Sequence, residues 1–156
     1  MSTHDVEVLL VEDNPADVEL TMHSLARHGV TARIHVAHDG VEALDFVFCR
    51  GVFAARSPAV PPKLVLLDLK LPKIDGLEVL RQLKADPRTR AIPVVMLTSS
   101  KMERDVLSSY RLGVNSYVQK PVDFEQFQVA VAQLGLYWLV ANEPSPPDSV
   151  PSEGGS

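Results

Sequence analysis

Five residues with carboxylate, hydroxyl or ammonium side chains each follow a short apolar run of the sequence. They are Glu12, Asp13, Asp68, Thr98 and Lys120. Carboxylates that are brought close together repel one another, and a hard divalent cation with oxygen ligands relieves this repulsion. Mg²⁺ in proteins usually binds one or two carboxylates together with water and phosphate oxygens. The residue types therefore predict a Mg²⁺ site, with Mn²⁺ as the alternative ion, that also handles a phosphoryl group.

An aspartate beside such a cation can act as a nucleophile and form an aspartyl phosphate, and Asp68 is the candidate for this role. Thr98 would offer a hydroxyl and Lys120 an ammonium to the phosphoryl oxygens, which stabilises charge in the transfer state. Taken singly, these residues also fit ordinary roles as helix-capping acids, loop acids, strand hydroxyls or solvated cations. Their shared place after successive apolar runs favours one common site over independent coincidences.

Five apolar runs rich in Val, Ile and Leu alternate with longer segments of helical periodicity. This pattern predicts an α/β fold of the (βα)₅ type, a doubly wound parallel sheet with helices on both faces. The predicted strands span residues 6–11, 32–37, 64–67, 93–97 and 116–119. Right-handed crossovers bring the carboxyl ends of such strands to one edge, where ligands bind. The residues that could do chemistry should therefore meet at that edge.

Helix-start signals follow each predicted strand and support this order of elements. Asn14-Pro15 places a capping residue before a proline at the first helical position. Capping boxes or close variants occur at residues 39–42, 75–78, 100–103 and 123–126. Gly29 and Gly113 stand where C-terminal caps are expected. The segment 51–63 is longer than the usual link between a helix and a strand.

The composition is that of an ordinary globular domain and argues against several classes of function. The chain has 156 residues, 46% of them hydrophobic and 22% charged, with a net charge of -5. Its lysines and arginines are scattered, which argues against nucleic acid as a partner. Without a long apolar run or a leader pattern, we expect a cytoplasmic protein that does not enter a membrane. One domain is predicted at residues 1–142, followed by a flexible tail rich in Pro, Ser and Gly at 143–156.

The single cysteine and the histidines show no spacing typical of a metal site. Cys49 has no cysteine partner and is predicted to be a buried apolar residue in a reducing compartment. The histidines lack zinc-binding patterns such as HExxH, and we expect them on the surface or in loops. They are His4, His23, His28, His35 and His38.

Four segments of the chain resemble the signature blocks of the response regulator receiver family. The segments are VLLVEDN (8–14), LVLLDLKLPKIDG (64–76), VVMLTSS (94–100) and SYVQKPVD (116–123), and the resemblance extends over about residues 5–139. It implies a flavodoxin-like three-layer sandwich with strand order 2-1-3-4-5. It also implies that the chain accepts a phosphoryl group from a phosphohistidine on a sensor histidine kinase.

The family's functional residues map onto positions of this sequence. By resemblance, Asp68 is the phosphorylated aspartate, and Glu12 and Asp13 are the metal-binding acids, although aspartate is more frequent than glutamate at the first of these positions. The backbone carbonyl of Lys70 would complete the metal site. Thr98 and Tyr117 match the switch pair, and Lys120 matches the family's phosphate-binding lysine, whose bond to Pro121 is expected to be cis.

Two other classes of function remain open from the sequence. One is a pseudo-receiver that binds partners without phosphorylation, which the complete set of acids, threonine and lysine argues against. The other is a phosphatase of the haloacid-dehalogenase type, which carries a second acid two residues after its nucleophile, where this chain has Lys70. The preferred interpretation is a signalling domain that catalyses only its own phosphorylation and dephosphorylation, and that signals through protein–protein contacts.

The segment 134–140, LGLYWLV, is predicted to continue the last helix and is apolar on nearly every side. Tyr137 and Trp138 are therefore candidates for a homodimer interface, and the alternative is that they fold back onto the sheet. This ending, the VDFEQF segment and the long 51–63 link resemble the single-domain regulators of bacterial and cyanobacterial phytochrome kinases. The resemblance implies a bacteriophytochrome as the kinase, and a histidine phosphotransfer protein as a further candidate partner.

Overall fold

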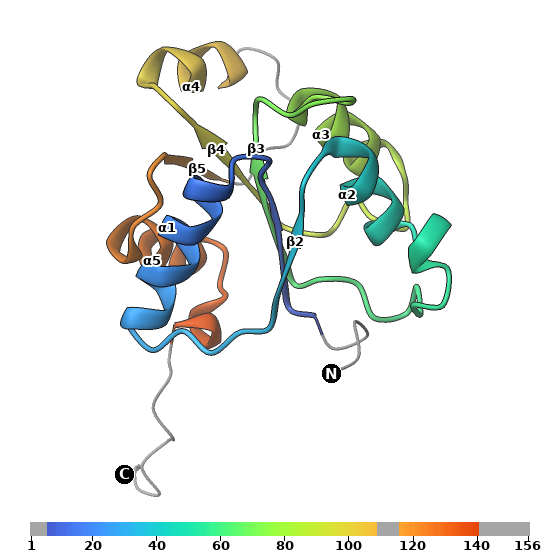
Figure 1. Cartoon of the computed structure of the whole chain (residues 1–156), viewed down its shortest axis with the longest axis horizontal. Helices are drawn as coiled ribbons and strands as arrows, with labels where there is room; N and C mark the ends of the chain where they lie inside the picture. Colours follow the sequence, from blue (N-terminus) through green and yellow to red (C-terminus); the bar gives the residue numbers. More distant parts are fainter. Residues whose placement is uncertain (1–5, 109–115, 141–156) are drawn as a thin grey trace, which may run out of the picture.

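A computed structural model describes residues 6–108 and 116–140 and shows a central parallel sheet with helices on both faces (Figure 1). Along the chain the α-helices and strands are β1 (Val8–Val11), α1 (Pro15–Arg27), β2 (Ile34–Ala37), α2 (Gly40–Val47), β3 (Leu64–Asp68), α3 (Gly76–Ala85), β4 (Val94–Thr98), α4 (Lys101–Ser108), β5 (Ser116–Gln119) and α5 (Phe124–Gln133). Short 3₁₀ turns, η2 (Gly51–Phe53) and η3 (Tyr137–Leu139), follow α2 and α5. The predicted order of elements is confirmed.

The sheet has the order β2-β1-β3-β4-β5, and all neighbouring strands are parallel. Every residue of β1, β3 and β4 is buried. Continuous burial is expected of strands that are covered on both faces, and it explains why these segments read as unbroken apolar runs. The flavodoxin-like three-layer arrangement is thus confirmed.

Alternate residues of β1 supply the two halves of the core. Leu9 and Val11 pack on the side of α2 and α3, while Val8 and Leu10 pack on the side of α1 and α5. The side chains of successive strand residues point to opposite faces, so one short strand can serve both layers. Truncation of any of these leucines to alanine would cost about 2–5 kcal/mol.

Side-chain caps start the helices where the sequence predicts them. The Asn14 side chain accepts hydrogen bonds from the backbone N–H groups of Ala16 and Asp17 at 2.9 and 3.1 Å. Aspartates cap α2, α3 and α5 in the same way, at positions 39, 75 and 123. Gly29 follows α1 in the left-handed region with a φ of 78°, as a C-terminal cap requires. Gly113 lies outside the described residues.

The prediction that the last helix continues through residue 140 is wrong. Helix α5 ends at Gln133, and Gly135 adopts a φ of 73° that turns the chain into η3. Leu139 is then buried against the core, whereas Tyr137 and Trp138 are 64% and 46% exposed. A glycine pays no side-chain penalty in the left-handed region, so the chain leaves the helix there despite its apolar character.

Two expectations about single residues are also wrong. His35 lies in β2 instead of on the surface or in a loop, and its ring stacks on Phe46 with a centroid distance of 4.5 Å. Phe46 and Phe53 enclose this ring, which the histidine's spacing in the sequence could not reveal. Cys49 is only half-buried, because it follows the end of α2 in a left-handed conformation with a φ of 56°.

The long 51–63 link is anchored by Arg56. This arginine is 3% exposed, and its guanidinium lies 3.8 Å from the centroid of the Phe46 ring. It donates hydrogen bonds to the carbonyl oxygens of Phe46 and Val60. None of the helices in the described ranges has the length and apolar character needed to cross a bilayer.

Candidate functional site

The residues predicted to do chemistry lie at one edge of the sheet, at the carboxyl ends of four strands. Glu12 and Asp13 follow β1, Asp68 and Thr98 are the last residues of β3 and β4, and Lys120 follows β5. The register aligns these ends, since Asp68 pairs with Leu97 and Thr98 with Gln119. Because the strands are parallel, the turns that follow them all leave the sheet at this edge.

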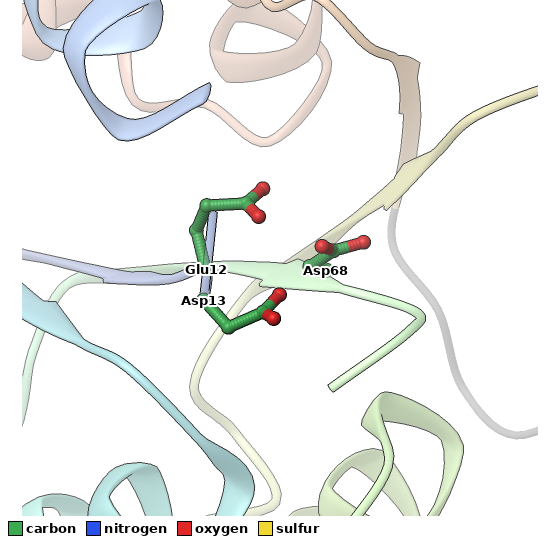
Figure 2. Close-up of side chains that lie close together, drawn as sticks. All are labelled: Glu12, Asp13 and Asp68. Carbon is green, nitrogen blue, oxygen red and sulfur yellow. The ribbon is translucent and has the colours of Figure 1, made fainter. Parts of the chain in front are cut away.

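Three carboxylates form a cluster at the centre of this edge. Glu12, Asp13 and Asp68 each offer an oxygen, and these oxygens all lie within 4.8 Å of one another. Figure 2 shows Glu12 and Asp13 side by side at the end of β1 and Asp68 beside them on β3. Glu12 and Asp68 are 1% and 3% exposed, whereas Asp13 is exposed. A set of oxygen donors that is open to water on one side suits Mg²⁺ or Mn²⁺, which keep several water ligands.

Lys120 is bound to three carboxylates. Its Nζ atom lies 2.9 Å from Asp68 Oδ2, 3.1 Å from Glu12 Oε1 and 3.1 Å from Asp17 Oδ2. Burial alone would lower the pKa of Lys120, but its hydrogen bonds to Asp68 and Glu12 outweigh this effect and raise the pKa. The lysine is therefore a fixed positive charge beside Asp68.

Glu12 is the carboxylate with the most perturbed environment in the cluster. Burial and the negative charge of Asp68 raise the pKa of Glu12 to about 7, although the Asn14 backbone N–H and Lys120 act in the opposite direction. The Asn14 N–H donates to Glu12 Oε2 at 3.1 Å. Glu12 therefore binds a proton more readily than an ordinary glutamate, and a bound cation would displace that proton.

Asp17 is a member of the site that the sequence analysis missed. It lies in the first turn of α1, where acids are common for electrostatic reasons. Because Asn14 and Pro15 begin α1 directly above the sheet edge, the first helical turn brings Asp17 back over Lys120. Its spacing of four residues from Asp13 across a helix start was the available signal.

Thr98 and Tyr117 occupy different surroundings. Thr98 is 1% exposed, and its carbonyl oxygen accepts a hydrogen bond from the Lys120 backbone N–H at 2.7 Å. Tyr117 is not part of the carboxylate cluster: its half-buried ring packs beside the core on the α2 and α3 side. The guanidinium of Arg104 lies 5.5 Å from the centroid of this ring. The peptide bond between Lys120 and Pro121 is cis.

Lys70 connects the cluster to α4. Its backbone N–H donates to Asp68 Oδ1 at 3.3 Å, and its Nζ lies 3.1 Å from Glu103 Oε2. Glu103 also accepts a hydrogen bond from the Ser99 N–H at 2.8 Å. This N–H bond and the Lys70 ammonium hold the pKa of Glu103 below its usual value, so the carboxylate is ionised at neutral pH.

Gly76 allows α3 to begin against the carboxyl edge of the sheet. A Cβ atom at this position would lie 2.1 Å from the backbone oxygen of Asp68 and 2.8 Å from the Leu69 Cα. The Gly76 N–H donates to the Leu69 carbonyl at 2.8 Å. The absence of a side chain at residue 76 therefore sets how closely the turn after Asp68 folds back on β3.

Comparisons with known proteins agree on one family. The model of the response regulator receiver domain matches residues 8–132. The chain is 51% identical to the bacteriophytochrome response regulator AtBRR, with a TM-score of 0.82 over 88% of this chain and 98% of that one. It is 46% identical over 132 residues to the probable methanogenesis regulatory protein FilR2 of Methanothrix harundinacea, which covers 85% of this chain and 83% of FilR2.

A third similar protein was solved with a metal ion bound. The structure of the Mn²⁺-bound form of the response regulator Rcp1 is 37% identical, with a TM-score of 0.68 over 87% of this chain and 96% of that one. Rcp1 of Synechocystis is also 39% identical to this chain over 132 residues. The chain therefore belongs to the response regulator receiver family, the signalling domains of two-component systems, and its relatives include phytochrome response regulators.

Proposed function

We propose that this chain accepts a phosphoryl group on Asp68 from a phosphohistidine of a sensor histidine kinase, in a reaction that requires Mg²⁺ or Mn²⁺. The observation that carries the proposal is the contact of 2.9 Å between Lys120 Nζ and Asp68 Oδ2 inside a cluster of three carboxylates. A buried aspartate held by a fixed cation, next to oxygen ligands for a second cation, is suited to receive an anion. Glu12, Asp13, Asp68 and the backbone carbonyl of Lys70 are the proposed metal ligands.

The transfer is a substitution at phosphorus. An oxygen of Asp68 attacks the phosphorus atom and forms an O–P bond while the N–P bond to histidine breaks. The electron pair of the broken bond stays on the imidazole nitrogen, which takes a proton from solvent. A bound Mg²⁺ would neutralise part of the charge on the phosphoryl oxygens. Lys120 supplies a second positive charge at Asp68, and the Thr98 hydroxyl is the proposed donor to a phosphoryl oxygen.

Incubation with acetyl phosphate and Mg²⁺ tests this proposal. We expect intact-protein mass spectrometry to show a gain of one phosphoryl group in the wild-type chain. The gain should disappear in Asp68→Asn and after removal of the metal by EDTA. The control Asp45→Asn changes an acid on α2 that pairs with Arg50, away from the carboxylate cluster, and should behave like wild type. Phosphorylation that survives in Asp68→Asn would move the acceptor to another residue and defeat the proposal.

A phosphatase or an inert pseudo-receiver fits the site less well. The residue two positions after Asp68 is Lys70, whose ammonium pairs with Glu103, so no second acid stands where a phosphatase of the haloacid-dehalogenase type needs one. A pseudo-receiver has no need of a half-buried lysine bound to three carboxylates. We therefore propose a signalling role in which the chain acts only on its own phosphoryl group, with Thr98 and Tyr117 as the switch pair.

The proposed partners follow from the relatives and from the exposed C-terminal aromatics. Because AtBRR is a bacteriophytochrome response regulator, we propose a kinase of that class as the phosphoryl donor. Tyr137 and Trp138 remain exposed on η3, and we propose that they contribute to a homodimer interface. Sedimentation at tens of micromolar should show a dimer in the wild type and a monomer in Trp138→Ala; a monomeric wild type would contradict this.

Other expectations from the sequence stay predictions. They are the division into a domain at 1–142 and a tail at 143–156, a cytoplasmic location, and a histidine phosphotransfer protein as a further partner. Both ends of the chain and the boundary at 142–143 lie outside the described residues.

A further inference from the structure

The start of α4 carries an anion that is bound by two donors next to the phosphorylation site. Glu103 Oε1 accepts the Ser99 N–H at 2.8 Å, and Glu103 Oε2 lies 3.1 Å from Lys70 Nζ. Both donors come from turns at the carboxyl edge: Ser99 directly follows Thr98, and Lys70 follows Asp68 by two residues. The two oxygens of one carboxylate therefore join the turns after β3 and β4.

The Ser99 N–H is the first amide of its turn to leave the hydrogen bonding of the sheet. The two carbonyls before it still accept hydrogen bonds from residues that directly follow the neighbouring strands. Leu97 accepts from the Leu69 N–H at 3.1 Å, and Thr98 accepts from the Lys120 N–H at 2.7 Å. A backbone N–H released at a strand end beside an aspartate is a natural donor to an anion at that aspartate. In this structure the donor is already engaged by Glu103.

A phosphoryl group on Asp68 would bring a charge of about -2 and three acceptor oxygens to this edge. The Lys70 backbone N–H bonds to Asp68 Oδ1, which places this residue beside the carboxyl. Its side chain is 75% exposed and flexible, so its ammonium could turn from Glu103 to a group added to Asp68. Ionised Glu103 and the phosphoryl group would then require the same ammonium and the same amide. Two anions cannot both hold these donors without strong repulsion, so one must give way.

We propose that Glu103 is a built-in competitor of the phosphoryl group, and that its displacement from Ser99 and Lys70 is the step that frees α4. This inference rests on the proposed phosphorylation of Asp68. The attachment of α4 fits such a release, because Leu107 is its single buried residue among Lys101–Ser108, while Met102 and Val106 are 76% and 53% exposed. With so little apolar contact, the polar contacts at its start carry much of its attachment.

The displaced helix would alter the surroundings of Tyr117. Arg104 is the residue after Glu103, and its guanidinium lies over the Tyr117 ring at 5.5 Å from the centroid. The Arg104 N–H also donates to the Ser100 carbonyl at 3.3 Å, in the same first turn. Movement of this turn would therefore change the contact between Arg104 and the ring, which would link the state of Asp68 to the side chain on β5.

Binding of beryllofluoride, a phosphoryl analogue, tests the competition at equilibrium. In the presence of Mg²⁺, Glu103→Ala should bind beryllofluoride about fivefold more tightly than wild type, because the competing ion pair and hydrogen bond are gone. Glu103→Gln, which keeps the shape and loses the charge, should lie between them. The matched control is Glu78→Ala, since Glu78 holds the equivalent place in the first turn of α3, with its N–H bonded to Asp75 at 2.9 Å.

The Ser99 amide resonance in a ¹H–¹⁵N spectrum is the direct readout. It should shift when wild type binds beryllofluoride, and the metal-loaded Glu103→Ala protein should already show part of that shift. Equal affinity of Glu103→Ala and wild type for beryllofluoride would contradict the competition. So would a Ser99 resonance that stays unchanged when wild type binds beryllofluoride. Wild type that binds no beryllofluoride at all would instead overturn the proposed phosphorylation, so the two failures are distinguishable. Thermal unfolding verifies that each variant is folded.

Discussion

Within the described residues, half-buried Lys120 and buried Arg56 are two cations whose partners differ in kind. Lys120 lies among the carboxylates of Glu12, Asp17 and Asp68, so negative charge exceeds positive charge around it. Arg56, in the link between α2 and β3, bonds to the Phe46 and Val60 carbonyls and stacks on the Phe46 ring.

The difference separates a site from a structural anchor. The carbonyl oxygens and the ring face that Arg56 contacts belong to the 51–63 link and to α2, so Arg56 holds this link in place. An excess of carboxylates around Lys120 raises the free energy of the folded state unless a further cation neutralises the remaining negative charge. We therefore expect substitutions at Lys120 to change chemistry and substitutions at Arg56 to change stability.

The sharpest test of the site is Lys120→Ala. Loss of this ammonium should slow phosphorylation of Asp68 by acetyl phosphate about 100- to 1000-fold, the effect of removing one preorganised group that stabilises developing charge. Quantitative mass spectrometry of phosphorylated protein over time measures it. Asp17→Asn, which leaves two carboxylates on Lys120, should show a much smaller decrease. A normal rate in Lys120→Ala would remove the distinction between the two cations.

The matching test of the anchor is Arg56→Leu. The variant loses the hydrogen bonds to the Phe46 and Val60 carbonyls and the stacking on Phe46, so the free energy of unfolding should fall by about 2–4 kcal/mol. Urea unfolding gives this value. Arg50→Ala, which removes an exposed pair with Asp45, should cost less than about 1 kcal/mol. The phosphorylation rate of folded Arg56→Leu should equal that of wild type, and a large decrease would show that the anchor also supports the site.

The pH dependence of metal binding sharpens the comparison further. Because the pKa of Glu12 is raised to about 7, the Mg²⁺ affinity should fall towards tenfold per pH unit as the pH decreases below 7. Isothermal titration in two buffers should also detect proton release on binding. In metal-free protein the sign is opposite: the stability contribution of this group is present below pH 4.5 and is lost as the pH rises through 7. Glu12→Gln should bind Mg²⁺ weakly and without this pH dependence.

The smallest effect belongs to His35 in the neighbourhood of Arg56. Burial lowers the pKa of His35, so its contribution to stability is present above pH 6.5 and is lost as the pH falls through the lower value of the folded state. His35→Phe, which can keep the stacking on Phe46, should unfold with a weaker dependence on pH between 5 and 7. Urea unfolding at a series of pH values measures this. His23→Gln, a change at an exposed histidine of α1, should retain the wild-type profile.

Much of the architecture followed from local signals in the chain. The strands observed at Val8–Val11 and Ser116–Gln119 lie within or match the predicted runs 6–11 and 116–119, and the capping residues begin the helices as expected. These features depend on neighbours within a few positions, which is why a single sequence reveals them. The strand order 2-1-3-4-5 came from family resemblance, because apolar periodicity does not state which strands are adjacent.

The sequence by itself determined the order of the elements and the set of polar residues at the strand ends. The tertiary structure decided what those residues contact: Asp17 meets Lys120 across 103 positions of the chain, and His35 is enclosed by aromatic rings. It also decided that Gly135 ends the last helix before the exposed aromatics. The physical reason is that a strand or cap is stabilised by nearby residues, whereas a buried charge is stabilised by groups that only folding brings together.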